Sequence, residues 1–257
     1  MLIDSHCHLN LSDQNIEQLV SFAEKQGIDA ILNVSVDMDS FPDILATATT
    51  YENVFASVGV HPNTEEANPV TESALIEAAQ HDKVIAIGET GLDYHYNQGD
   101  MDWQHERFRV HIRAAKACNK PLIIHCREAP ADVIRILQEE NAQTCGGVMH
   151  CFVEDMDTAQ AAMDLGFYIS FSGIVTFKNA KALQAVAKQV PQDRILVETD
   201  APWLAPTPYR GKPNQPAYVL HVAKFLADLR GEDFETLAKA TTNNFFRLFK
   251  PPTVSIR

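Results

Sequence analysis

Short apolar runs alternate with amphipathic stretches along the whole chain. The runs are rich in Val and Ile, are apolar on both faces and end at polar breaks, a pattern typical of strands buried on both sides of a parallel sheet. We predict eight strands, at residues 1–4, 30–34, 54–60, 84–88, 122–125, 147–150, 167–171 and 195–198. Apolar residues at helical spacing predict helices between them, clearly at 16–23 and 133–137 and more weakly at 41–51.

Eight alternating strand and helix units predict an α/β fold, a (β/α)8 TIM barrel formed as one domain by residues 1–257. An open doubly wound sheet is the alternative, but it usually has fewer strands and often a glycine-rich phosphate loop after the first strand. Here His-Cys-His follows the first strand, and the sequence contains no GxGxxG or Walker A pattern. The barrel is therefore favoured.

Composition narrows the class of protein without identifying it. Hydrophobic residues make up 46% and charged residues 21% of the 257 positions, which excludes a disordered or fibrous chain. The five cysteines form no CxxC pair, the N-terminus lacks the pattern of a signal peptide, and no apolar run is long enough to span a membrane. We therefore expect a soluble cytoplasmic protein with free thiols.

The formal net charge of −13 argues against a broad basic surface for nucleic acid. It does not argue against a negatively charged substrate whose charge is balanced by a bound metal ion.

Metal-binding residue types stand at the predicted carboxyl ends of several strands, where the active residues of TIM barrels lie. His6 and His8 are two residues apart on a strand, so both side chains point to one face and can reach one ion. An isolated pair of this kind can equally be two polar residues at a strand end. Four more strand ends carry further potential ligands, so we predict a metal site formed by His6, His8, Glu89, His125, His150 and Asp200.

Three further residues are candidates for substrate binding. His61, at a strand end, either caps a loop or contacts substrate, and Arg127, two residues beyond His125, pairs either with a phosphate or with a nearby acid. Arg210 lies in a loop with Tyr209 and Lys212, which suits either a single-stranded nucleic-acid end or a solvated turn. Trp203 and Tyr94 are candidates for either stacking on a substrate or packing.

Other polar residues near these positions have structural interpretations. Glu198 is expected to point into the barrel and pair with a neighbour, and Cys7, Cys126 and Cys151 to face away from the metal as small buried residues. Four histidines in apparently helical stretches are expected at the surface or the edge of the core: His81, His105, His111 and His221.

Seven segments in order carry a resemblance to a known family. They are IDSHCHL at 3–9, VGVHP at 58–62, IGETGLDYH at 87–95, IHCR at 124–127, MHCF at 149–152, VETDAPWLAP at 197–206 and TTNNFFRLF at 241–249. In these segments the chain resembles the TatD-type metal-dependent hydrolases of the amidohydrolase-like barrels, and most of all their YjjV-like branch. The last segment resembles the family's closing helix.

The resemblance implies two divalent ions, Zn, Mg or Mn. His6, His8 and Asp200 would match the ligands of the first ion, His125 and His150 those of the second, and Glu89 the bridging carboxylate. Two such ions would activate a water molecule, and Asp200 is the residue expected to accept its proton.

The expected function is hydrolysis of phosphoester bonds, most concretely removal of nucleotides from a DNA 3′ end, with a DNA strand end or a small phosphoester as substrate. Hydrolysis of C–N or ester bonds in a small metabolite remains an alternative, because fold does not determine substrate. A non-catalytic metal-binding protein is disfavoured, since six potential ligands exceed the four of a closed structural site.

Overall fold

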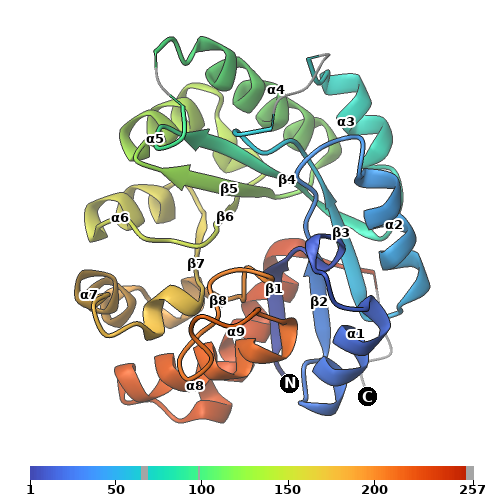
Figure 1. Cartoon of the computed structure of the whole chain (residues 1–257). Helices are drawn as coiled ribbons and strands as arrows, with labels where there is room; N and C mark the ends of the chain where they lie inside the picture. Colours follow the sequence, from blue (N-terminus) through green and yellow to red (C-terminus); the bar gives the residue numbers. More distant parts are fainter. Residues whose placement is uncertain (65–68, 98, 253–257) are drawn as a thin grey trace.

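The computed structural model describes residues 1–64, 69–97 and 99–252. Its strands form one parallel sheet in chain order: β1 (Ile3–Cys7), β2 (Ala30–Asn33), β3 (Val54–Val58), β4 (Val84–Asp93), β5 (Leu122–Arg127), β6 (Gly147–Met149), β7 (Tyr168–Phe171) and β8 (Ile195–Val197). Helices surround this sheet (Figure 1). The structure therefore confirms the predicted (β/α)8 TIM barrel.

The helices follow the strands along the chain. They are α1 (Ile16–Lys25), α2 (Phe41–Thr50), α3 (Glu72–Ala78), α4 (Asp102–Cys118), α5 (Pro130–Glu139), α6 (Met156–Asp164), α7 (Lys181–Gln189), α8 (Val219–Arg230) and α9 (Phe234–Phe249). The predicted helices at 16–23, 41–51 and 133–137 correspond to α1, α2 and α5. In the part of the chain that is described, no helix is both long and apolar enough to cross a membrane.

Strand β4 is longer than predicted. The prediction ended it at residue 88, but β4 continues to Asp93 and keeps pairing with β5, from Thr90 opposite Ile124 to Asp93 opposite Arg127. Polar residues after Gly88 disguise this continuation in the sequence. As a result, the acidic residues of this segment lie on a strand and not in a loop.

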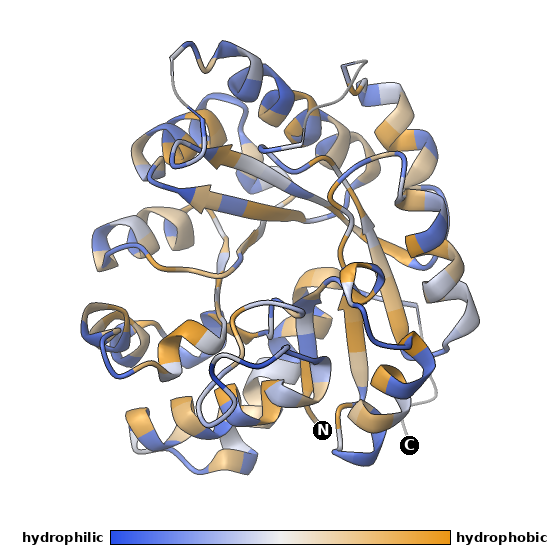
Figure 2. Ribbon diagram, in the orientation of Figure 1, coloured by the Kyte–Doolittle hydropathy of each residue, from blue (hydrophilic) through white to orange (hydrophobic). Residues whose placement is uncertain are grey.

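Two hydrophobic layers stabilise the barrel, and Figure 2 shows its strands to be largely hydrophobic. One layer lies between the strands and the surrounding helices. The inner layer consists of residues near the beginnings of strands, among them Ile3, Leu32, Phe55, Ile85, Ile123, Val148 and Leu196. Phe245 and Phe249 of α9 pack against this inner layer. Helix α9 thus closes the amino-terminal end of the barrel with apolar side chains and leaves polar chemistry to the opposite end.

The seam between the last and first strands is held by polar contacts. The carboxylate of Asp4 on β1 accepts hydrogen bonds from the N–H of Thr199, at 2.8 Å, and from its hydroxyl, at 2.6 Å. One step further, the N–H of Asp200 donates to the carbonyl of His6 at 3.0 Å. These bonds set the position of Asp200 relative to His6, on β1, and His8, which follows it.

Polar side chains on the inner face of α4 hold the segment that follows β3. Arg107 donates to the carbonyls of His61, at 3.1 Å, and Thr64, at 2.7 Å. Gln104 accepts a hydrogen bond from the N–H of Asp93 at 3.0 Å. One helix therefore positions both the loop that carries His61 and the end of β4.

His111 continues this polar face and is completely buried, so its predicted place at the surface or core edge was wrong. Its Nε2 accepts a hydrogen bond from the N–H of Val60 at 2.9 Å, and its Nδ1 lies 2.8 Å from the carbonyl of Arg107. Because both ring nitrogens have backbone partners, the imidazole can occupy an interior position that helical spacing alone would assign to an apolar residue.

The closing helix provides a test of the inner layer. Phe245→Ala should lower the free energy of unfolding by about 3–5 kcal/mol, the usual range for deleting a fully buried ring. The matched control is Phe246→Ala, since Phe246 is only partly buried and should cost about 1 kcal/mol. Urea unfolding of the two variants measures this difference, and equal losses would show that α9 does not close the barrel.

His111 should make stability depend on pH. Burial lowers its pKa from 6.5 to about 4, so the unfolded chain takes up a proton at a higher pH than the folded chain does. This contribution is complete above pH 6.5 and is lost as the pH falls toward 4, a change of about 3 kcal/mol. The metal-free wild type should therefore lose about that much more stability than His111→Gln between pH 7 and 4 in urea titrations. Parallel losses in the two proteins would contradict this assignment.

Candidate metal centre

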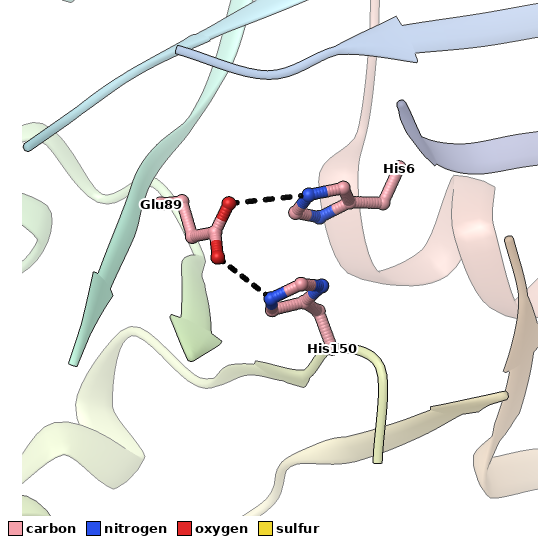
Figure 3. A group of neighbouring side chains, drawn as sticks. All are labelled: His6, Glu89 and His150. Carbon is pink, nitrogen blue, oxygen red and sulfur yellow. Dashed lines mark ion pairs between the residues drawn. The ribbon is translucent and has the colours of Figure 1, made fainter. Parts of the chain in front are cut away.

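A single buried carboxylate, Glu89 on β4, lies among five imidazoles. Its Oε1 is 2.8 Å from His150 Nε2, 3.0 Å from His125 Nδ1 and 3.3 Å from His61 Nε2, and its Oε2 is 3.3 Å from His6 Nε2 and 3.6 Å from His8 Nε2. Figure 3 shows the two oxygens of Glu89 directed at His6 and His150. Residues from four separate strand ends therefore converge on one side chain.

All six predicted metal ligands are brought together here. Their donor atoms fall into three groups, each with its atoms within 4.8 Å of one another: His6, His8 and Asp200; His6, Glu89 and His150; and His61, Glu89 and His125. Asp200 Oδ1 lies 3.7 Å from His6 Nε2 and 3.6 Å from His8 Nε2. Because Glu89 belongs to two groups, its carboxylate lies between two candidate ion positions.

Two glycines of β4 allow the close approach that places Glu89. Gly88 has φ +145°, and a Cβ there would lie 2.7 Å from the carbonyl oxygen of Ile123 on β5. Gly91 has φ +136°, and a Cβ there would collide with the carbonyl of His125. The glycines therefore let β4 lie against β5 with Glu89 and His125 facing each other.

Three imidazoles are oriented by a hydrogen-bond acceptor, here called an anchor, next to their outer nitrogen, the ring nitrogen that points away from Glu89. His8 Nδ1 lies 2.9 Å from the carbonyl of Val34, His125 Nε2 lies 3.0 Å from Asp93 Oδ2, and His150 Nδ1 lies 3.3 Å from Glu198 Oε1. These acceptors place the proton of a neutral ring on the outer nitrogen. The inner nitrogen then directs its lone pair toward Glu89, as a metal ligand requires.

His61 has the opposite tautomer. Its Nδ1 accepts a hydrogen bond from the N–H of Asn63 at 3.0 Å, and burial lowers its pKa, so the neutral ring carries its proton on Nε2. That Nε2 faces Glu89 Oε1. His61 is therefore placed as a hydrogen-bond donor to the centre, although distance alone groups it with the potential ligands.

The carboxylate of Glu89 and the histidines around it together favour a bound positive charge. Burial raises the pKa of Glu89, but the facing His150 and His61 and the hydrogen bond with His125 outweigh it, so the pKa lies well below its usual range. Burial lowers the pKa of His150, but Glu89 and Glu198 outweigh it and raise the pKa well above 6.5. Protons on histidine would thus supply the charge that divalent cations supply in a metal site.

One of the buried polar atoms that lack a hydrogen-bond partner, His150 Nε2, points the same way. Within the described residues, His6 Nδ1, His150 Nε2 and Glu198 Oε2 have no hydrogen-bond partner. His150 Nε2 faces the centre, 2.8 Å from Glu89 Oε1, whereas His6 approaches Glu89 and Asp200 with its other nitrogen, Nε2. Nitrogen and carboxylate oxygen donors of this kind fit Zn or Mn, and the carboxylates also suit Mg.

Asp93 is a residue of this site that was not predicted from the sequence. It accepts hydrogen bonds from His125 and, at 2.8 Å, from the side chain of Asn63. Burial raises its pKa, but these bonds outweigh it and keep the carboxylate ionised. Asp93 lies four residues after Glu89, a spacing that places both on one face of a strand, and this signal is readable once β4 is known to continue.

Glu198 has the structural role expected of it. Its Oε1 accepts a hydrogen bond from the N–H of Cys151 at 2.7 Å and lies close to His150. Cys126 and Cys151, however, were expected to face away from the metal, and both instead line the cavity above it. At Cys151 strand alternation does not apply, because β6 ends at Met149 and Cys151 has φ +44°.

A cavity of about 750 Å³ opens over the cluster at the carboxyl end of the barrel. His61, Arg127 and Trp203 line it, and the Arg127 guanidinium lies over the ring of Tyr96, 4.8 Å from its centroid. These three sequence candidates therefore face the space available to a substrate.

Two other candidates lie elsewhere. The Arg210 guanidinium lies 4.2 Å from the centroid of the Phe177 ring, and Arg210 is not among the described residues that line the cavity. The hydroxyl of Tyr94 lies 2.7 Å from both Asp132 and His105. In the structure, therefore, Arg210 and Tyr94 make packing and hydrogen-bonding contacts with the protein.

Comparisons with known proteins point to one family. The family model described as TatD related DNase matches residues 3–250. The Escherichia coli K12 protein called uncharacterized metal-dependent hydrolase YcfH is 46% identical over 253 residues, which cover 96% of this chain and 95% of that protein. The Escherichia fergusonii protein called 3′-5′ ssDNA/RNA exonuclease TatD is 32% identical over 239 residues, covering 91% and 92%.

A solved structure shows the same fold over the full length. The crystal structure of the TatD homologue YjjV from Escherichia coli K12 matches with a TM-score of 0.88 and 28% identity, covering 98% of each chain. Sequence identity is thus higher to YcfH than to YjjV. The family model, these relatives and the barrel together show that the chain is a metal-dependent hydrolase that belongs to the TatD family.

Proposed function

We propose that the chain hydrolyses phosphodiester bonds at the 3′ ends of nucleic-acid strands with the help of two divalent ions. The observation that carries this proposal is the position of Glu89 between two groups of potential ligands. The name of the Escherichia fergusonii relative, an exonuclease on single-stranded DNA and RNA, supports the choice of substrate.

The ligand assignment follows the family resemblance: His6, His8 and Asp200 would hold the first ion, His125 and His150 the second, and Glu89 both. Two features of the geometry support it. The donor atoms of His6, His8 and Asp200 form one group, and those of Glu89 are grouped once with His150 and once with His125. Bound there, two divalent ions supply Lewis acidity, which makes a water acidic near neutral pH and stabilises charge on a phosphoryl group. The chain's own contribution is to fix these donors through Val34, Asp93 and Glu198.

Asp200 is the residue best placed to take a proton. Burial raises its pKa, but the hydrogen bond with His8 and the nearby His6 and His150 outweigh it, so the carboxylate stays ionised. Its side chain is 14% exposed and lines the cavity, whereas that of Glu89 is only 3% exposed. It can therefore accept the proton of an attacking water and release it to solvent.

His61 and Arg127 supply groups for the substrate. The Nε2–H of His61 faces the centre and can donate to a phosphoryl oxygen. Arg127 lines the same cavity and provides a positive charge for a phosphate.

A second candidate is hydrolysis of a C–N or ester bond in a small metabolite. The cavity volume of about 750 Å³ favours it, because sites for small molecules have this size. A panel of phosphodiester, amide and ester substrates distinguishes the two, and activity confined to the amides or esters would replace our proposal.

Removing the central charges should stop catalysis without unfolding the protein. Glu89→Gln and Asp200→Asn should each lower kcat on an oligonucleotide by about a thousand-fold, since each removes a proposed ligand and Asp200 also accepts the proton. Asp164→Asn, an exposed substitution on α6, is the matched control and should keep wild-type kcat. Circular dichroism checks the fold, and near-normal activity of metal-replete Asp200→Asn would remove that residue from the mechanism.

Chelation should abolish activity reversibly. After dialysis against EDTA we expect no hydrolysis of oligonucleotides, and titration with Mn²⁺, Zn²⁺ or Mg²⁺ should restore it because the donor set accepts all three. Inductively coupled plasma mass spectrometry verifies removal of metal. Full activity in verified metal-free protein would exclude a metal-dependent mechanism.

A further inference from the structure

Exposed hydrophobic side chains gather at the mouth of the metal cavity. Among the described residues, seven large hydrophobic side chains are exposed, and four of them line this one cavity: Leu11, Tyr96, Val153 and Trp203. They come from the segments that follow β1, β4, β6 and β8. We call these four residues the apolar rim.

Single exposed hydrophobic residues are normal, but four from separate loops around one opening are typical of a binding surface. Trp203 is 51% exposed and Tyr96 67% exposed, so both rings have free area. The ring centroid of Trp203 lies 5.4 Å from that of His8, at an interplanar angle of 60°. A group bound on Trp203 is thus directly beside the first group of metal ligands.

The rim carries little positive charge. Arg127 is the only lysine or arginine among the described residues that line the cavity, and it lies over the Tyr96 ring. The net charge of the chain is −13. Phosphates beyond the scissile one therefore meet little electrostatic attraction, and binding energy for a nucleic-acid strand must come from its bases.

We propose that the apolar rim binds the unpaired bases of a strand end and that Trp203 stacks on the base next to the scissile phosphate. This inference rests on the proposed function and adds a basis for selectivity. Every base has an aromatic face, so stacking suits many sequences, and Tyr96 with Arg127 over it offers a second stacking position. A base within a duplex is already stacked and paired, so the rim selects single-stranded ends.

The two tryptophans of the chain provide a matched test. Trp103 is also exposed, at 43%, but it lies on α4, outside the cavity lining, with Arg107 over its ring. With Mn²⁺ and an oligonucleotide that has a single-stranded 3′ end, Trp203→Ala should raise KM about ten-fold while kcat stays within about two-fold. Trp203→Phe should recover most of the loss, and Trp103→Ala should match wild type.

Fluorescence reports the contact directly. In a Trp103→Phe background Trp203 is the sole tryptophan, and a phosphorothioate oligonucleotide with a single-stranded end should quench its emission at concentrations near KM. A blunt duplex of the same sequence should quench it at least about ten-fold less well, because its bases are paired.

The outcomes separate this inference from the proposed function. If the wild type hydrolyses bis(p-nitrophenyl) phosphate and oligonucleotides but Trp203→Ala has the KM of Trp103→Ala, the rim does not bind bases and the inference is overturned. Equal quenching by the duplex and the single strand would overturn the selectivity. If the metal-loaded wild type hydrolyses neither phosphodiester, the proposed function itself fails.

Discussion

The structure depends on one electrostatic arrangement: the carboxylate of Glu89 is buried among imidazoles at the end of the barrel and needs positive charge beside it. Removing a charge from water costs several kcal/mol unless it is paired and hydrogen-bonded. Three of the surrounding rings use their outer nitrogen on an anchor, so their inner lone pairs face Glu89 and one another. Cations between these donors would turn mutual repulsion into attraction.

The rest of the fold makes this arrangement possible by dividing the barrel into two ends. Phe245 and Phe249 of α9 complete an apolar interior near the strand beginnings, which provides stability where no chemistry takes place. At the other end, polar contacts position the residues of the site. Asp4 accepts a hydrogen bond from Thr199 at the seam, and Gln104 accepts one from the N–H of Asp93. The loops beyond the strand ends, which leave an apolar rim around the cavity, are then free to set what binds there.

Much of this was predictable from the sequence, for a physical reason. Parallel strands in a barrel bring their carboxyl ends together, so His6, Glu89 and Asp200 could be grouped although they are far apart in the chain. The residues that orient the histidines were harder to predict, because their positions depend on where each strand ends. Asp93 was missed because β4 runs past Gly88, and Cys151 faces the cavity because β6 ends before it.

The contacts of residues outside the strands could not be predicted, because the sequence does not show which way their side chains point. The pattern of α4 shows that position 111 lies on the helix, but not that two backbone groups form hydrogen bonds with its ring. Similarly, Arg210 is next to an aromatic residue in sequence, yet in space it lies over Phe177 and outside the cavity lining. The tautomer of His61 follows only from the N–H of Asn63.

The central claim is that Glu89 lies between two ion positions. Native mass spectrometry of the intact protein, titrated with Mn²⁺ after removal of all metal, counts the bound ions directly. We expect two ions per chain to bind at saturation. Saturation at a single ion, or no specific binding, would contradict a two-ion centre around this carboxylate.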